Sequence, residues 1–171
     1  NRPGGDGIIS AEACANAAPD GYTLCLTQSA VIVGNPLLHS KLPYDPERQF
    51  LPIIGMGVFT SALLVHPSVP AKTMRELAQL AQQRPDKLRI SVIGLGGIVH
   101  LGVELFKAAA NVKMINVQYK GGGPAAIDLM GGHIEAGLFD VPAVIMHVPT
   151  GKMRALAVTS GERILPVRSE E

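Results

Sequence analysis

Hydrophobic residues recur with two periods along this chain, one typical of strands and one typical of helices. Between Leu88 and Asp140 short apolar runs alternate with longer helical segments, in the order strand, helix, strand, helix, strand. Strands joined through helices form βαβ units, whose loops gather at the carboxyl edge of a parallel sheet. The pattern therefore predicts an α/β fold, and ligands of open α/β sheets bind at that edge.

The clearest βαβ unit is the stretch 116–140, in which two groups of glycines bracket a short helix. Pro124 is predicted to occupy the first helical position, where its missing N–H is not needed. Gly131 and Gly132 are predicted to end the helix, because glycine accepts the left-handed turn that closes the last carbonyls. The glycine loop before Pro124 is therefore placed at the carboxyl edge of the sheet.

Capping residues and periodicity place the remaining elements. Thr73 and Glu76 have the spacing of a capping box, which predicts a helix at 74–84. The predicted helix 98–110 carries Ile98, Leu101, Leu105 and Ala108 on one face. Other helices are predicted at 8–17, 31–40 and 141–150, and strands at 22–27, 53–57, 60–65, 88–93 and 153–159.

The predicted strands 53–57 and 60–65 carry no charge and are flanked by prolines. This composition indicates two buried strands that carry the chain from one lobe to another. The apolar run Ile53–Val65 is too short to span a bilayer. We therefore interpret it as interior β-structure and not as a membrane helix.

The composition limits the possible classes of function. Of the 171 residues, 47% are hydrophobic and 17% are charged, which is enough apolar material for a core. The net charge is +1 and the fifteen Lys and Arg residues form no run, so the sequence lacks a nucleic-acid footprint. Aromatic residues make up only 4%, so stacking surfaces for bases are scarce. We predict no nucleic-acid partner.

The cysteines and histidines show no metal-ligand spacing. Cys14 and Cys25 form no CxxC pair; we expect two buried free thiols, with a disulfide between a helix and the next strand as the alternative. The five histidines form neither HxxxH nor HExxH, and no GxSxG elbow is present. We therefore predict no metal, no cofactor and no catalytic residue, which favours a binding protein over an enzyme.

The motif Gly94-x-Gly96-x-x-Val99 follows a predicted strand and opens a helix, which is the context of a dinucleotide fingerprint. The third glycine is missing, and the next strand ends at Gln118 and Tyr119 without an acid for a ribose hydroxyl. A nucleotide-dependent enzyme is therefore the weaker alternative. A glycine turn at a helix N-terminus also suits a carboxylate or another anion, or is simply a tight turn without a ligand.

Lys120 and Asp140 are predicted at the carboxyl edge as well. Lys120 follows a strand and precedes Gly121, so it supplies a point charge beside a closely approachable backbone, or is simply solvated. Asp140 ends the next strand and can accept from a ligand amine or hydroxyl, pair with Lys120, or cap the helix entered at Pro142. Thr27-Gln28-Ser29 occupies the corresponding edge of the first lobe, where a helix cap is the alternative.

Five motifs occur in an order and at separations that resemble one known family. They are Asn1-Arg2-Pro3-Gly4, Ala18-Pro19-Asp20-Gly21-Tyr22-Thr23-Leu24, Leu42-Pro43-Tyr44-Asp45-Pro46, Val117-Gln118-Tyr119-Lys120-Gly121 and Gly151-Lys152-Met153-Arg154-Ala155-Leu156-Ala157-Val158-Thr159. Across essentially its whole length the chain resembles the Bug/TctC-type proteins. These are extracytoplasmic solute receptors of tripartite tricarboxylate transporters.

This resemblance implies a periplasmic-binding-protein fold of type II-like architecture, with two α/β lobes joined by crossing strands. It implies that a small organic carboxylate binds between the lobes in the periplasm, and that closure presents it to integral membrane permease subunits. The lobes are expected at 1–58, with 159–171 returning to this first lobe, and at 59–158, with the crossing strands. A ligand-sensing module for a signalling partner is the remaining alternative.

The resemblance also implies which residues bind the ligand, through backbone amides, hydroxyls and bridging water. Family members are longer, so the first lobe is expected to be truncated. Ile98 and Val99 stand where relatives usually have Ser or Thr, which suggests a less polar ligand or reliance on backbone amides. The expected ligand-binding residues are Thr27, Gln28, Ser29, Gly94, Gly96, Gly97, Ile98, Val99, His100, Tyr119, Lys120, Gly121 and Asp140.

Overall fold

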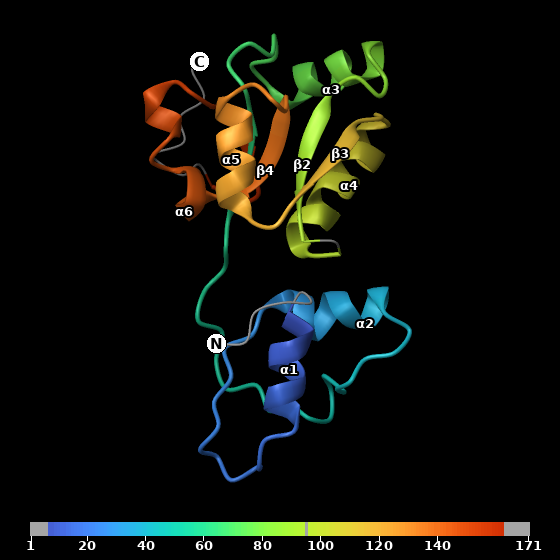
Figure 1. Ribbon diagram of the computed structural model, residues 1–171, viewed down its shortest axis with the longest axis vertical. Helices are drawn as coiled ribbons and strands as arrows, with labels where there is room; N and C mark the ends of the chain where they lie inside the picture. The colour runs from blue at the N-terminus through green and yellow to red at the C-terminus, as the bar shows by residue number, and fades with distance from the viewer. Residues whose placement is uncertain (1–6, 95, 163–171) are drawn as a thin grey trace. The chain divides into compact units, whose positions relative to one another are not determined.

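The computed structural model of the protein describes residues 7–94 and 96–162. The chain divides into two compact units, and each is described by itself (Figure 1). The first unit comprises the chain up to Gly57 together with the segment Leu95–Ile98. The second comprises Val58–Gly94 and the chain from Val99 onward.

In the described part of the chain, the second unit contains a five-stranded sheet of order β3-β2-β4-β1-β5. Strand β2 is parallel to both β3 and β4, whereas β1 is antiparallel to β4 and β5. The predicted α/β fold is therefore confirmed, with one antiparallel strand inside an otherwise parallel sheet. The strands are β1 Ser61–Val65, β2 Arg89–Ile93, β3 Ile115–Tyr119, β4 Ala136–Asp140 and β5 Arg154–Val158.

Helices cover both faces of this sheet (Figure 1). Helices α3 (Met74–Gln83) and α4 (Ile98–Ala110) pack on one face, in a buried cluster that includes Leu77, Val103 and Ile90. Helices α5 (Gly122–Met130) and α6 (Val141–Val144) pack on the other, in a cluster that includes Leu129, Val144 and Phe139. Successive strand residues point to opposite faces, so β1, β2, β4 and β5 contribute to both clusters, whereas β3 packs only on the second one through Val117 and Tyr119.

The start of α3 agrees with the capping prediction. The Glu76 N–H donates to Thr73 Oγ1 over 3.1 Å, as a capping box requires. The Glu76 carboxylate accepts at 2.6 Å from the N–H of Lys72, one residue before the expected donor. The helix ends at Gln83, two residues before Pro85.

Helix α5 begins two residues earlier than the sequence suggested. It starts at Gly122, so Pro124 lies at the third helical position and not at the first. This position tolerates proline because the first four N–H groups of a helix have no intrahelical partner. The end is as expected, since Gly132 has a left-handed φ of 71° immediately after the last turn.

The apolar face of α4 singled out in the sequence is not its core face. Val103 is buried, and Val99, Phe106 and Ala110 pack against the same core cluster. Leu105, from the face singled out earlier, is 70% exposed. The helix has apolar residues on two sides, so periodicity alone does not identify the buried one.

The first unit has a small core of its own. Helix α1 (Ile8–Ala15) packs through Ala11 against Val31 and Tyr44. The Tyr44 hydroxyl donates to the Val31 carbonyl over 2.9 Å and accepts from the buried Asn35 amide over 3.2 Å. The π-helical turn η2 (Ala30–Gly34) and helix α2 (Asn35–Leu38) replace the continuous helix predicted at 31–40.

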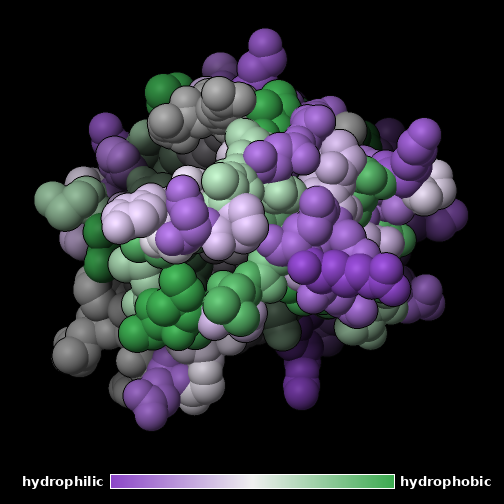
Figure 2. Space-filling model, turned by 90° about the horizontal axis from the view of Figure 1, so that it is seen from below, coloured by the Kyte–Doolittle hydropathy of each residue, from purple (hydrophilic) through white to green (hydrophobic). Residues whose placement is uncertain are grey.

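Two predicted strands of the first unit are wrong. The segments 22–27 and 53–57 are not assigned as strands and have no strand partner among the described residues. Their apolar side chains are uncovered, with Tyr22 93% exposed, and Figure 2 shows hydrophobic residues open on one face of the molecule. A strand requires a neighbour to pair its backbone groups, and an apolar sequence alone does not supply one.

The remaining predicted elements occur in shortened form. The helix expected at 141–150 is divided into α6 and the 3₁₀ turn η3 (Val148–Thr150). The Thr159 N–H donates to the Ser61 carbonyl at 2.9 Å, so this residue lies beside β1 of the second unit, and the return of the chain end to the first lobe stays a prediction. Residues 163–171, included in that expectation, lie outside the described residues.

The expectation of two buried free thiols is also wrong. Cys14 and Cys25 form a disulfide, with their Cα atoms 6.3 Å apart. That expectation assumed that Cys25 lies in a buried strand, whereas the residue is exposed in the extended segment 22–27. The disulfide therefore ties this segment to α1, where no sheet holds it.

We expect that denatured, unreduced protein contains no titratable thiol and that reduction releases two. Replacing Cys25 with Ser should lower the free energy of unfolding by about 3 kcal/mol, because a crosslink across a sequence separation of 11 restricts the unfolded chain. Thiol titration and urea unfolding check both statements. Free thiols before reduction would contradict the assignment.

We expect Gly137→Ala to destabilise the second unit by about 1–3 kcal/mol. A Cβ at Gly137 would overlap the Ser91 hydroxyl and the Phe139 ring, both within the sheet and its buried cluster. Gly123→Ala is the matched control, because its Cβ would meet nothing within 4 Å in helix α5. Equal melting temperatures for the two variants would contradict this account of the core.

Candidate functional site

Three helix starts meet at one edge of the second unit's sheet. Strands β2, β3 and β4 end there and lead into α4, α5 and α6 (Figure 1). Because β1 runs in the opposite direction, its first residue, Ser61, lies at the same edge, opposite Asp140. We call this edge the carboxyl edge, and it is the edge that the sequence predicted for ligand binding.

The start of α5 occupies the middle of the carboxyl edge. A Cβ at Gly122 would lie 3.8 Å from Cβ of Ala143 in α6 and 4.0 Å from Cδ1 of Ile93 at the end of β2. A Cβ at Gly121 or Gly123 would meet nothing within 4 Å. The backbone of this turn is therefore packed at its centre and open on both sides.

The open turn carries features that suit an anion. Helix α5 has no side-chain cap at Gly121, so its first N–H groups are available to a ligand and the helix dipole places positive charge there. The exposed Lys120 precedes this turn and forms no ion pair with the described residues. Two of the predicted ligand residues, Lys120 and Gly121, thus lie together.

Asp140 lies at the same edge but in neither of its alternative roles. Its carboxylate forms no ion pair with Lys120 in the described structure, and it makes no side-chain cap bond to α6. Instead, the Ser61 hydroxyl donates to its Oδ1 over 2.9 Å. Ser61 was not expected at this edge, because only the antiparallel register of β1 and β4 brings it beside Asp140.

The predicted ligand residue Tyr119 is held by helix α5. Its hydroxyl donates to Asp128 Oδ2 over 2.7 Å, and His133 lies 3.3 Å from the other Asp128 oxygen. Burial and this hydrogen bond raise the pKa of Tyr119 to about 12. The same bond, assisted by His133, lowers the pKa of Asp128. In this arrangement Tyr119 fixes α5 on β3, and contact with a ligand stays a prediction.

The turn before α4 divides between the two units. Gly94 and Gly96 both have left-handed φ angles, of 63° and 82°. The φ of Gly96 requires glycine, and within the first unit a Cβ there would also lie 2.7 Å from Cδ1 of Leu38. Ile98 is exposed, whereas Val99 packs in the core of the second unit. Gly97, in the same turn, stays a predicted contact.

His100 belongs to a polar network on α4. Its Nε2 lies 3.8 Å from the Glu104 carboxylate, which accepts from Lys107 at 2.8 Å and from Asn116 at 2.7 Å. These donors, Lys107 first, lower the pKa of Glu104. The network ties α4 to β3 and gives His100 a structural contact.

The predicted first-lobe residues lie in the first unit. Thr27, Gln28 and Ser29 are exposed, and the Gln28 carbonyl accepts from the Val31 N–H over 3.0 Å. Ser29 precedes η2 without a side-chain cap bond, so the capping alternative is not observed. The role of these three residues in binding stays a prediction.

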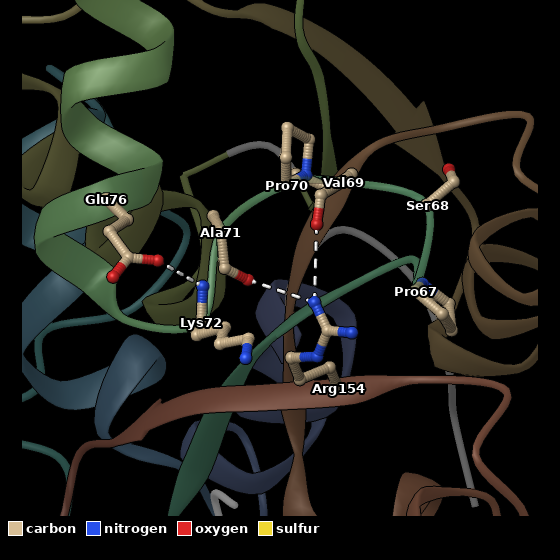
Figure 3. A pocket seen from close by; sticks show the side chains of 8 residues that line it. All are labelled: Pro67, Ser68, Val69, Pro70, Ala71, Lys72, Glu76 and Arg154. Carbon is tan, nitrogen blue, oxygen red and sulfur yellow. Dashed lines mark hydrogen bonds between the residues drawn. The ribbon is translucent and has the colours of Figure 1, made fainter. Parts of the chain in front are cut away.

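At the edge opposite the carboxyl edge, two charged side chains are paired with each other. Arg89 and Glu135 form a two-point ion pair there, with Arg89 Nη2 2.7 Å from Glu135 Oε1. A cavity of about 570 Å³ also opens there, between Arg154, Glu76 and the loop 67–72 (Figure 3). Arg154 Nη1 donates to the carbonyls of Val69 and Ala71 at 3.3 and 3.2 Å, so it holds this loop in place.

Within 7–94 and 96–162, no group of three His, Cys, Asp or Glu side chains is placed to hold a metal ion. No helix in these ranges has both the length and the apolar character needed to cross a membrane.

Comparison with known proteins gives the family. The model of the tripartite tricarboxylate transporter family receptor, TctC, matches residues 1–167. The chain belongs to this family. The family consists of receptors and not of enzymes. Protein BugT of Bordetella pertussis is 34% identical over 165 residues, which are 95% of this chain and 50% of BugT.

Solved structures agree with this assignment. A structure described as a periplasmic transporter is 34% identical with a TM-score of 0.85, over 96% of this chain and 55% of that chain. The R. palustris protein Rpa4515 with adipate is 34% identical with a TM-score of 0.86, over 98% and 56%. MatC from Rhodopseudomonas palustris with bound malate is 26% identical with a TM-score of 0.78, over 94% and 54%.

These matches confirm the periplasmic-binding-protein fold expected from the sequence motifs. They also show that the chain spans about half the length of the relatives it matches.

We expect the protein to lose stability at high pH in part because Tyr119 is deprotonated. Tyr119→Phe should lack this part of the loss. Folding raises the pKa of Tyr119 from 10.0 to about 12, so between these values the folded state keeps a proton that the unfolded chain releases. The contribution of Tyr119 to the free energy of unfolding is therefore constant below pH 10 and is lost as the pH rises toward 12.

Urea unfolding between pH 8 and 12 measures this effect. The wild type should lose stability more steeply above pH 10 than Tyr119→Phe does. Tyr22→Phe, which removes an exposed phenol, is the control and should follow the wild type. Identical pH profiles for the wild type and Tyr119→Phe would contradict the assigned hydrogen bond.

Proposed function

We propose that this chain is part of a periplasmic receptor that binds a small organic carboxylate at the carboxyl edge of the second unit. The receptor then delivers the ligand to integral membrane permease subunits of a tripartite tricarboxylate transporter. The observation that carries the proposal is the uncapped start of α5 beside Lys120, in a member of the TctC receptor family.

The chemistry of the edge supports a carboxylate. Backbone N–H groups at a helix start bind carboxylate oxygens, and Lys120 adds a positive charge nearby. Neither group forms an ion pair or a side-chain cap in the described structure, so a ligand displaces no protein partner. The neighbours with adipate and malate both hold dicarboxylates, which supports this class of ligand.

The Cys14–Cys25 disulfide supports the proposed compartment. Such bonds persist in the bacterial periplasm and are rare in the cytosol. The related structures described as periplasmic point to the same location.

The nucleotide alternative has lost its main support. Its motif depended on Gly96 as a position for close approach of a pyrophosphate. The left-handed φ of 82° already explains why glycine is required there. The neighbouring genes distinguish a signalling module from a transporter receptor. The gene for a transporter receptor is expected beside genes for one large and one small membrane protein.

We expect organic acids, and neither NAD nor ATP, to raise the melting temperature of the natural full-length protein. A ligand at 100 times its Kd adds about 2.7 kcal/mol to the free energy of unfolding. Lys120→Gln should weaken binding about fivefold, which corresponds to about 1 kcal/mol of electrostatic attraction.

Lys113→Gln is the matched control for this experiment. Lys113 is also exposed, but it precedes β3, at the opposite edge from Lys120, and its loss should leave the affinity unchanged. A broad panel of organic acids that gives no thermal shift would reject the carboxylate proposal. Equal effects of the two lysine variants would reject the role of Lys120.

A further inference from the structure

Only one oxygen of the Asp140 carboxylate accepts a hydrogen bond from a described residue. The Ser61 hydroxyl donates to Oδ1 over 2.9 Å, and Ser61 is 5% exposed, so water does not readily replace it. Among the residues that the structure describes, Oδ2 of Asp140 has no hydrogen-bond donor, and no cation lies within 4.0 Å of the carboxylate. The half-exposed Asp140 carboxylate at the proposed ligand edge therefore has one oxygen that can still accept a hydrogen bond.

Ser61 is in turn fixed from its other side by β5. Its N–H donates to Thr159 Oγ1 over 3.0 Å, and its carbonyl accepts from the Thr159 N–H over 2.9 Å. The Val141 N–H donates to the Thr60 carbonyl over 2.9 Å on the side of β4. The position of the Asp140 carboxylate is therefore set by three adjacent strand ends and not by a flexible loop.

The bond to Ser61 leaves two common structural roles of Asp140 unfilled among the described contacts. Asp140 does not cap α6 through its side chain and does not neutralise a cation, which are the usual structural roles of an aspartate at a helix start. Holding a carboxylate in place while leaving an oxygen open is the arrangement expected of a hydrogen-bond acceptor for a ligand.

We propose that Asp140 accepts a hydrogen bond from a hydroxyl or ammonium group of the ligand, and that Ser61 is its positioning residue. The proposal rests on the proposed function, because Lys120 and the start of α5 supply the carboxylate end of the site. A ligand that carries a donor beside its carboxylate matches both ends, whereas a second carboxylate facing Asp140 meets a like charge.

The dimensions of the edge fit one small molecule. Strands β3 and β4 flank β2, so the backbones at Lys120 and Asp140 are separated by about two strand spacings, or roughly 10 Å. The start of α5 lies between them, against Ile93 and Ala143. A separation of this order leaves room between the two residues for a hydroxy acid or amino acid of a few carbons.

The test compares matched ligands on the natural full-length protein by titration calorimetry. Malate and succinate differ by one hydroxyl, and aspartate and succinate by one ammonium group. We expect malate or aspartate to bind at least about tenfold more tightly than succinate, since a site built to bond a hydroxyl or ammonium group loses this contact when the group is absent.

Variants test whether Asp140 and Ser61 produce the preference for a ligand with a hydroxyl or ammonium group. Asp140→Asn and Ser61→Ala should both reduce the ratio of affinities toward one, and Ser61→Thr, which keeps the hydroxyl, should restore it. Ser91→Ala is the matched control, because it removes a fully buried hydroxyl of the same sheet that has no partner among the described residues. Its ratio should equal that of the wild type.

The possible outcomes separate this inference from the proposed function. Wild-type protein that binds succinate as tightly as both donor-bearing acids overturns the inference and leaves a carboxylate receptor intact. An unchanged ratio in Asp140→Asn, or in Ser61→Ala if the first variant does not fold, overturns the assignment of residues. No binding of any acid rejects the proposed function itself.

Discussion

The pairing of β1 with strands on both of its sides is the interaction on which the second unit depends. All five residues of this strand, Ser61–Val65, are buried, so each of its backbone groups requires a partner inside the protein. Strands β4 and β5 supply these partners in antiparallel registers. Because β1 runs against its neighbours, its first residue meets their last ones, and this places Ser61 between Asp140 and Thr159 at the carboxyl edge.

The same requirement explains the contrast with the first unit. Its extended segments 22–27 and 51–57 are also rich in apolar residues, yet no described strand pairs with them and their side chains are exposed. Burial of an extended segment without partners would leave its N–H and C=O groups unsatisfied, which costs more than apolar contact returns. A disulfide and the bonds between Asn35, Tyr44 and Val31 hold this unit instead of a sheet.

The sequence predicted what local rules determine. Helices α3 and α5 and all five strands of the second unit follow from caps, glycine stops and apolar runs, with ends displaced by at most a few residues. The core face of α4 could not be predicted, since apolar residues on two sides leave the choice to tertiary packing. Ser61 could not be found as a site residue either, since it is distant from Asp140 in sequence and only strand register unites them. The disulfide was the alternative and not the main expectation, because the segment around Cys25 was expected to be a buried strand.

The glycines of the second unit and its adjoining turn show that a glycine motif in the sequence does not by itself identify a ligand site. Gly96 is required by its left-handed φ of 82°, and Gly137 because Ser91 and Phe139 fill the space of a side chain. Gly121 and Gly123, around α5, instead adjoin open space where a Cβ atom would lie. Backbone conformation therefore explains Gly96 of the nucleotide-like motif, whereas neither packing nor a left-handed φ explains Gly121 and Gly123. In the proposed site, an anion approaches this open backbone beside Lys120, which forms no ion pair with the described residues, and the anchored Asp140 at the same edge limits what the rest of that anion carries.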